Sequence, residues 1–145
     1  MAQYNIIDYI TISSTGNATD FGDRTTSGTH NQSLAACASS TRGVMGGGIN
    51  TNTMDYVTIA STGNATDFGD LTAARYALTA AASPTRGVFF KGGNVLNTMD
   101  YITIASTGNA TDFGDDQVGA NGYQGACSNG TRATMGGGNG ALNII

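Results

Sequence analysis

The chain has 145 residues and a net charge of −4, with 6 basic and 10 acidic side chains. So few lysines and arginines argue against a nucleic-acid partner, which needs a basic footprint, and against attraction to an anionic membrane surface. There is no apolar run near the ~18 residues of a membrane helix and no charged-then-apolar leader, so we expect neither membrane insertion nor a signal peptide in this chain.

One segment of 16 residues occurs three times. Residues 8–23, 55–70 and 100–115 read DYITISSTGNATDFGD, DYVTIASTGNATDFGD and DYITIASTGNATDFGD, identical at 14 of 16 positions. A fixed period of 45–47 residues predicts one supersecondary unit in three copies. We therefore expect a single repeat domain over residues 1–145. Its repeats are approximately 24–70, 71–115, and 116–145 completed by 1–23.

In chain order, the sequence opens inside a repeat, with a strand that starts at Ile6 and a short strand over residues 20–23. The middle copy shows the full set of four strands best, because runs of small, β-branched and aromatic residues are separated there by turn residues. No stretch has a helical period with caps, so we expect an all-β fold. The four strands of this copy are predicted over residues 75–83, 86–91, 99–105 and 111–115.

The chain closes with a first and a second strand only, over residues 123–128 and 131–138. Two halves of one four-stranded unit are therefore predicted at opposite ends of the chain. Left alone, each half exposes a strand edge, which natural sheets avoid. We expect the two halves to be joined.

The four-strand unit resembles the kelch repeat, which forms one blade of a β-propeller. The second strand ends in paired glycines, and the short fourth strand carries phenylalanine in place of the late tryptophan of that family. The third-strand tyrosine lies further from this aromatic residue than is usual in kelch repeats. The repeated segment is also similar to those of kelch-like virion proteins of aquatic bacteriophages, particularly cyanophages, which implies a protein associated with the virion. The matching residues are Gly47-Gly48, Gly92-Gly93 and Gly137-Gly138, with Phe21, Phe68, Phe113, Tyr9, Tyr56 and Tyr101.

Three blades are too few to ring a common axis, since propellers need about four or more. We therefore expect a homodimer that forms a six-bladed β-propeller, in which each chain completes the split blade of the other. The alternative is a closed monomer, a β-trefoil or a prism, which would account for three repeats directly. The paired glycines after the second strand favour the propeller.

Alternating chain direction would place the connections of such a ring on two faces. One face would carry segments that differ between copies, and the other would carry the constant Ser-Thr-Gly-Asn-Ala-Thr turns and Thr-Arg pairs. Because loops on a rigid scaffold are where binding usually resides, we expect the variable face to bind. Its segments are 24–32, 71–76 and 116–123 between blades, with 49–53, 94–97 and 139–142 beside them.

The candidate binding residues on that face are aromatic, amide and guanidinium side chains, which suit carbohydrate or protein contacts. They are Arg75, Tyr76, Asn121, Tyr123 and His30. His30 is the only histidine, and no partner for a catalytic triad can be identified beside it, so it is expected to be a solvated loop residue.

An arginine recurs at one position of every repeat, as Arg42, Arg86 and Arg132. Such a ring of guanidiniums could bind an anion. The acidic residues of the repeat share its period, however, which favours structural ion pairs between neighbouring blades. The expected partners are Asp20, Asp67 and Asp112, or Asp23, Asp70 and Asp115.

Cys37 and Cys127 occupy the same repeat position, five residues before an arginine. Equivalent positions on different repeats are usually too far apart for a disulfide, which needs Cα atoms within ~7 Å. We therefore expect two buried thiols.

The repeated carboxylates do not match a calcium loop, because NATDFGD supplies two aspartates and no closing glutamate. We expect no metal, no cofactor and no enzymatic activity. The sequence predicts a structural or binding protein whose partners are a second copy of itself and an unidentified protein or glycan. The first reading is a phage virion or tail-associated interaction protein, and the alternative is a lectin-like carbohydrate-binding module.

Overall fold

The computed structural model describes residues 5–27, 32–93, 97–116 and 121–139. Within these ranges the chain forms twelve β-strands and no helix. The strands make four antiparallel sheets, two with two strands and two with four. The prediction of an all-β fold is confirmed.

The four sheets follow one another along the chain. The N-terminal hairpin consists of β1 (Ile6–Tyr9) and β2 (Thr19–Asp23). Sheet 1 consists of β3 (Ala35–Ala38), β4 (Arg42–Gly46), β5 (Thr53–Thr58) and β6 (Thr66–Asp70). Sheet 2 consists of β7 (Thr79–Ala82), β8 (Arg86–Phe90), β9 (Thr98–Thr103) and β10 (Thr111–Asp115). The C-terminal hairpin consists of β11 (Asn121–Ser128) and β12 (Ala133–Asn139).

The first strand of sheet 2 is shorter than the sequence predicts. It begins at Thr79 rather than at residue 75. Ala77 has a φ of 55°, so the chain turns there instead of running straight into the strand. The backbone N–H of Ala77 donates to Ser33 O at 2.7 Å, which ties the segment before β7 to the corresponding segment before β3.

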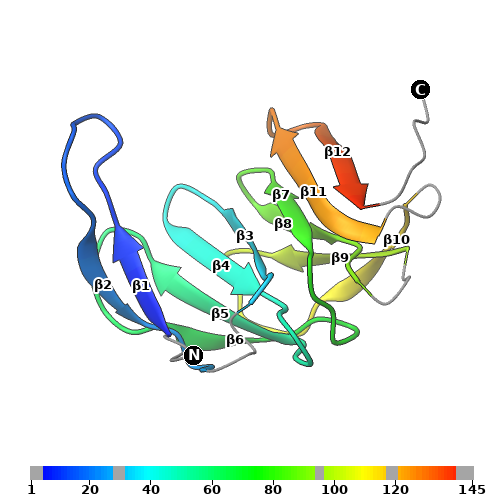
Figure 1. Cartoon of the computed structure of the whole chain (residues 1–145), viewed down its shortest axis with the longest axis horizontal. Coiled ribbons are helices and arrows are strands. Elements are labelled where there is room, and N and C mark those ends of the chain that lie inside the picture. Colours follow the sequence, from blue (N-terminus) through cyan, green and yellow to red (C-terminus); the bar gives the residue numbers. More distant parts are fainter. Residues whose placement is uncertain (1–4, 28–31, 94–96, 117–120, 140–145) are drawn as a thin grey trace.

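The sheets lie side by side along an open arc, with the two hairpins at its opposite ends (Figure 1). The first strands β3, β7 and β11 pack beside one another on the inner side of the arc, and the later strands of each sheet lie further out. Among the described strands, β1 and β12 each have one edge without a partner strand. Neither a closed barrel, which the alternative of a monomeric β-trefoil requires, nor a closed ring of blades forms among the described strands.

The main hydrophobic core lies between sheet 1 and sheet 2. Apolar residues at alternate positions of neighbouring strands point to the same side of a sheet, so each sheet has one face to bury here. Full burial of one such side chain stabilises the fold by about 1.5–3 kcal/mol. The central residues are at most 3% exposed; they are Val44, Met54 and Phe68 from sheet 1, and Phe89, Ile102 and Ile104 from sheet 2.

The inner part of this contact depends on a match between a thiol and a glycine. A Cβ atom at Gly87 of sheet 2 would lie 2.4 Å from Cys37 Sγ of sheet 1. Burial raises the pKa of the Cys37 thiol to about 12, so it packs as a neutral group. The next pair of sheets has Ala81 and Ala133 at the corresponding positions. A cysteine with a glycine and an alanine with an alanine have similar total side-chain volumes, so either pair suits the space between two sheets.

The two cysteines have different surroundings. Both are free thiols, and Cys37 is buried whereas Cys127 is exposed. The expectation of two buried thiols is therefore wrong for Cys127 in the single chain. The reason is its place on the C-terminal hairpin, beyond which no described sheet follows.

A set of backbone hydrogen bonds, here called the turn latch, joins the outer strands of successive sheets. The turn before β6 runs along β2, where Gly63 N donates to Phe21 O at 2.7 Å and Ala65 N donates to Asp23 O at 2.8 Å. The turn before β10 makes the same bonds to β6, with the same two distances, from Gly108 and Ala110 to Phe68 and Asp70.

The repeated asparagine and glycine complete this latch. Asn109 Oδ1 accepts a hydrogen bond from Asp70 N at 3.0 Å, as Asn64 Oδ1 does from Asp23 N. Gly69 has a φ of 134°, and a Cβ there would lie 2.5 Å from Gly108 O, so both the backbone conformation and the close approach require glycine. The constant residues of the repeat thus hold the sheets together.

The match between Cys37 and Gly87 can be tested by replacing both residues with alanine, as in the pair Ala81 and Ala133. Gly87→Ala alone should lower the free energy of unfolding by about 1–3 kcal/mol, because the new methyl group overlaps the thiol. The double variant Cys37→Ala with Gly87→Ala should recover most of this loss in urea-unfolding measurements. Equal losses in the single and the double variant would contradict the account.

Candidate binding surfaces

Backbone hydrogen bonds group the connections into two faces. The constant face consists of residues 39–41 and 59–65 with their repeat equivalents, and its turns are joined where Ile59 N donates to Thr41 O at 2.9 Å. The variable face consists of residues 47–52 and 71–78 with the described parts of their equivalents. There, Gly48 N donates to Arg75 O at 2.9 Å. The segments that differ between repeats therefore lie together.

The connection that enters sheet 1 is anchored by a buried ion pair. Arg24 Nη2 lies 2.8 Å from Asp55 Oδ2, and Arg24 Nε donates to the same oxygen at 2.9 Å. The hydroxyl of Thr25 donates to the other carboxylate oxygen. Asp55 on β5 is fully buried and Arg24 is 6% exposed. A charge pair this far from water is a structural anchor for the connection.

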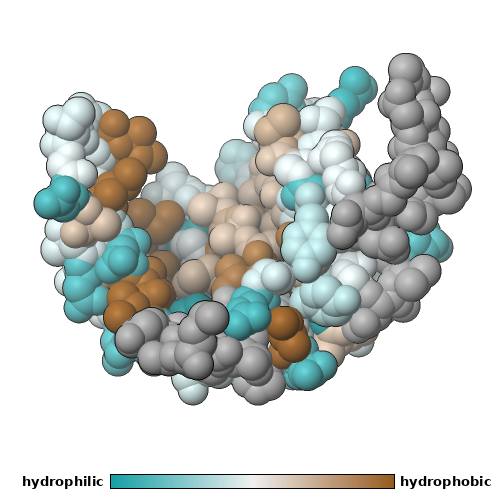
Figure 2. Space-filling model, viewed as in Figure 1, coloured by the Kyte–Doolittle hydropathy of each residue, from teal (hydrophilic) through white to brown (hydrophobic). Residues whose placement is uncertain are grey.

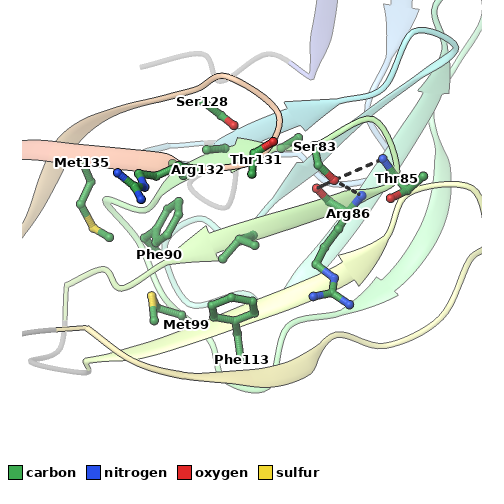
Figure 3. Close-up of a pocket in the computed structure, with 14 residues that line it drawn as sticks. Ser83, Thr85, Arg86, Phe90, Met99, Phe113, Ser128, Thr131, Arg132 and Met135 are labelled. Carbon is green, nitrogen blue, oxygen red and sulfur yellow. Dashed lines mark hydrogen bonds between the residues drawn. The ribbon is translucent and has the colours of Figure 1, made fainter.

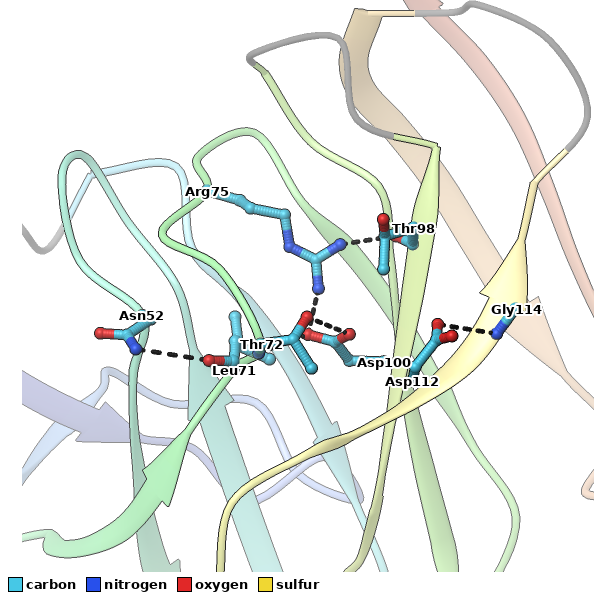
Figure 4. Close-up of polar contacts among 8 residues, drawn as sticks. All are labelled: Asn52, Leu71, Thr72, Arg75, Thr98, Asp100, Asp112 and Gly114. Carbon is cyan, nitrogen blue, oxygen red and sulfur yellow. Dashed lines mark hydrogen bonds and ion pairs between the residues drawn. The ribbon is translucent and has the colours of Figure 1, made fainter.

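The connection that enters sheet 2 is anchored in the same way (Figure 4). Arg75 forms an ion pair with Asp100 on β9 and donates to Thr98 O at 2.5 Å. Thr72 donates to the carboxylate twice, from its N at 3.0 Å and from its hydroxyl at 2.7 Å. Burial lowers the pKa of Arg75, and the neighbouring Asp100 opposes that shift.

These contacts show that one of the predicted binding residues, Arg75, is not available on the surface. Arg75 is 0% exposed, so the expectation that it offers its guanidinium on the binding face is wrong. The sequence reading also missed Asp55 and Asp100. The available signal was an acidic residue inside an otherwise apolar third strand in every repeat, because a buried carboxylate requires a partner. A third buried pair joins Lys91 Nζ to Asp116 Oδ2 at 2.6 Å.

Two of the three recurring arginines, Arg42 and Arg86, stack on tyrosines rather than pairing with acids. The Arg42 guanidinium lies 4.2 Å from the ring centroid of Tyr56, and Arg42 Nη1 donates to Ile104 O of sheet 2 at 3.0 Å. The Arg86 guanidinium lies 4.7 Å from the ring centroid of Tyr101. Within the described residues, the expected ion pairs with Asp20, Asp67 and Asp112 or with Asp23, Asp70 and Asp115 are not formed by Arg42, Arg86 or Arg132.

The third-strand tyrosine of all three repeats contacts the phenylalanine of its own repeat edge to face. The ring centroids are 6.0 Å apart in the N-terminal hairpin and in sheet 1, and 6.1 Å apart in sheet 2. The turn between the third and fourth strands of each repeat therefore brings the two aromatic residues together. The pairs are Tyr9 with Phe21, Tyr56 with Phe68, and Tyr101 with Phe113.

Two of the predicted binding residues lie close together on the variable face. Tyr123 N donates to Ala77 O at 3.0 Å, next to Tyr76 in the chain. Tyr123 is 61% exposed, whereas Tyr76 is partly buried and its ring covers Gly93. Asn121 lies in β11, and His30 falls outside the described residues.

An open cavity of about 570 Å³ lies between sheet 2 and the C-terminal hairpin (Figure 3). Sheet 2 contributes Arg86, Phe90, Met99 and Phe113 to its wall, and the C-terminal hairpin contributes Arg132 and Met135. Phe113 is 47% exposed, whereas the equivalent Phe68 is 2% exposed between sheets 1 and 2. The sequence reading did not foresee this cavity.

The described parts of the chain contain no group of three or more metal-binding side chains, counting histidine, cysteine, aspartate and glutamate. They also contain no helix that is long and apolar enough to cross a membrane.

Comparison with known proteins adds no family to these observations. No protein-family model matches the chain, and no curated protein is significantly similar to it.

We predict that Asp100→Asn lowers the free energy of unfolding by about 3–5 kcal/mol, because it leaves the buried Arg75 without its counter-charge. Asp67→Asn is the matched control, since Asp67 belongs to a repeated acidic position that is exposed. It should change stability by less than about 0.5 kcal/mol. Chemical unfolding monitored by circular dichroism gives both values, and similar losses in the two variants would contradict the structural role of the buried pair.

Proposed function

We propose that the chain is a non-enzymatic interaction protein, built as half of a β-propeller. In this proposal the four-stranded sheets are kelch-like blades. Two copies form a six-bladed ring, in which the N-terminal hairpin of each chain completes the C-terminal hairpin of the other. The variable face of the ring binds a protein partner. A place in a phage virion or tail agrees with the resemblance of the repeated segment and is part of the proposal.

The observation that supports this function best is how the constant polar residues are used. Asp55 and Asp100 bind buried arginines, Asn64 and Asn109 complete the turn latch, and Arg42 bridges sheet 1 to sheet 2. These residues are committed to contacts within and between sheets. Residues on the outer surface of the variable face make none of these contacts. They can therefore differ between repeats without loss of the fold.

Exposed residues of that face sit on rigid supports. In the connection 71–78, Arg75 and Leu71 are buried, while Thr72 and Ala74 between them are exposed. A short connection held at two buried points presents its remaining side chains in a fixed geometry. Such preorganisation lowers the entropy cost of binding a partner.

A photo-crosslinking amino acid distinguishes the two faces. Placed at Ala74 on the variable face, it should yield a covalent adduct with a partner polypeptide in the cells or virions that contain the protein. Placed at Thr62, which is exposed on the constant face, it should yield none. Adducts from Thr62 alone, or none from either position, would contradict the proposal.

A lectin-like function is the second candidate, and it is favoured by the exposed Tyr123, whose backbone N–H bonds to Ala77 next to Tyr76 in the chain. Aromatic faces commonly stack on sugar rings, and a ring of repeats would be multivalent. Binding on a glycan array that is lost in Tyr123→Ala would select this function over a protein partner.

A further inference from the structure

We propose that the open end of the arc is a docking site for the N-terminal hairpin of a second copy, in the same geometry as the contact between sheet 1 and sheet 2. This inference rests on the proposed two-chain ring and names the residues that close it. The site consists of the free edge of β12, the cavity between sheet 2 and the C-terminal hairpin, and the outer strand β10.

The strand edges match in register. In both four-stranded sheets the second strand pairs with the third so that the recurring arginine lies opposite the same threonine, as in Arg42 with Thr58 and Arg86 with Thr103. Extended to the free edges, this register pairs β12 with β1 of the second copy. The predicted partners are Arg132 with Thr11, Ala133 with Ile10, Thr134 with Tyr9, and Met135 with Asp8.

The turn latch has an unused half at each end of the chain. On β10, Gly114 has the same backbone conformation as Gly69, with a φ of 126°, yet a Cβ there would meet nothing within 4 Å. On the N-terminal hairpin, Gly16 is the equivalent of Gly63 and Gly108, and its N–H has no backbone acceptor among the described residues. In the docked pair, Gly16 N and Ala18 N of the second copy donate to Phe113 O and Asp115 O.

The cavity wall repeats part of the sheet 1–sheet 2 contact, since its Val88, Met99 and Phe113 are the equivalents of Val44, Met54 and Phe68, but it lacks equivalents of Ile102 and Ile104. Ile102 and Ile104 are 3% and 0% exposed because they pack on sheet 1. Their equivalents on the N-terminal hairpin, Ile10 and Ile12, are 61% and 94% exposed. In the second copy these two side chains enter the cavity, and Arg86 donates to Ile12 O as Arg42 does to Ile104 O.

The distribution of exposed apolar side chains supports this occupant. In the described part of the chain, every large hydrophobic residue that is exposed, except Tyr123, lies on the N-terminal hairpin or beside an open end: Ile6, Tyr9, Ile10, Ile12, Ile59 and Phe113. Figure 2 shows hydrophobic residues on the side of the N-terminal hairpin that faces the hollow of the arc. Concentrated apolar surface of this kind marks an interface.

The thiol and glycine positions predict the same order of sheets. Cys127 is exposed on the C-terminal hairpin, and Gly43 of sheet 1 has only side chains of its own sheet near its Cβ position. In the ring, the C-terminal hairpin precedes sheet 1 of the second copy, so Cys127 faces Gly43 as Cys37 faces Gly87. The contact between sheet 2 and the C-terminal hairpin, which lies between these two, has the alanine pair Ala81 and Ala133 instead.

The test is the mass of the full chain in solution, by light scattering after size exclusion. The unmodified protein should have twice the chain mass of 14.7 kDa. Ile12→Lys should have a mass near 14.7 kDa, because it replaces an apolar contact with a cation in a cavity whose wall already carries Arg86 and Arg132. The fold should be unaffected, since Ile12 is exposed in the single chain. Ser13→Lys is the matched control and should remain a dimer, since the equivalent Ala60 and Ala105 stay exposed in complete sheets.

Hydrogen exchange locates the contact. The amides of Gly16 and Ala18 should be protected in the dimer and lose protection in Ile12→Lys, while those of Gly63 and Ala65 stay protected in both. A monomeric unmodified protein would overturn the ring and the docking together. A dimer that persists in Ile12→Lys, with Gly16 and Ala18 unprotected, would overturn the docking alone.

Discussion

The face-to-face contact between sheet 1 and sheet 2 is the interaction on which the rest of the structure depends. It combines an apolar centre, a thiol that fits over a glycine, an arginine that reaches a carbonyl across the seam, and the backbone bonds of the turn latch. Each component comes from a position that is constant in the repeat, or from a pair of positions, such as Cys37 and Gly87, at which a larger residue faces a smaller one. Between sheet 2 and the C-terminal hairpin this contact is only partly formed, and in the proposed ring the N-terminal hairpin of a second copy completes it.

Buried charges have a second role, which is to fix the connections between sheets. Burying a charge is costly unless it is paired and hydrogen-bonded. Asp100 meets this condition, since it binds both Arg75 and Thr72 (Figure 4). The connections therefore enter each sheet at a defined point, and their variable residues are supported by the same carboxylate that stabilises the sheet. Stability and a binding surface are thus compatible within one short repeat.

Periodicity predicted the strands, their antiparallel order and a pair of strands at each end, because these depend on patterns within each repeat. It did not predict that Arg75 is buried or that Arg42 stacks on Tyr56, since both depend on contacts between residues far apart in the chain. The exposure of Cys127 also differs from expectation, because an equivalent position is buried only where a following sheet covers it. The cavity beside Phe113 could not be read from the sequence for the same reason.

The central claim is that the open contact is completed by a second copy, and the two thiols test it directly. In the single chain Cys37 is buried and Cys127 is exposed, so a thiol reagent should label one cysteine per chain. In the closed ring, Cys127 is covered by Gly43 of the second copy. The account predicts that neither thiol of the native protein reacts until the protein is unfolded. Rapid labelling of Cys127 in the native protein, at protein concentrations high enough to keep the dimer from dissociating, would contradict it.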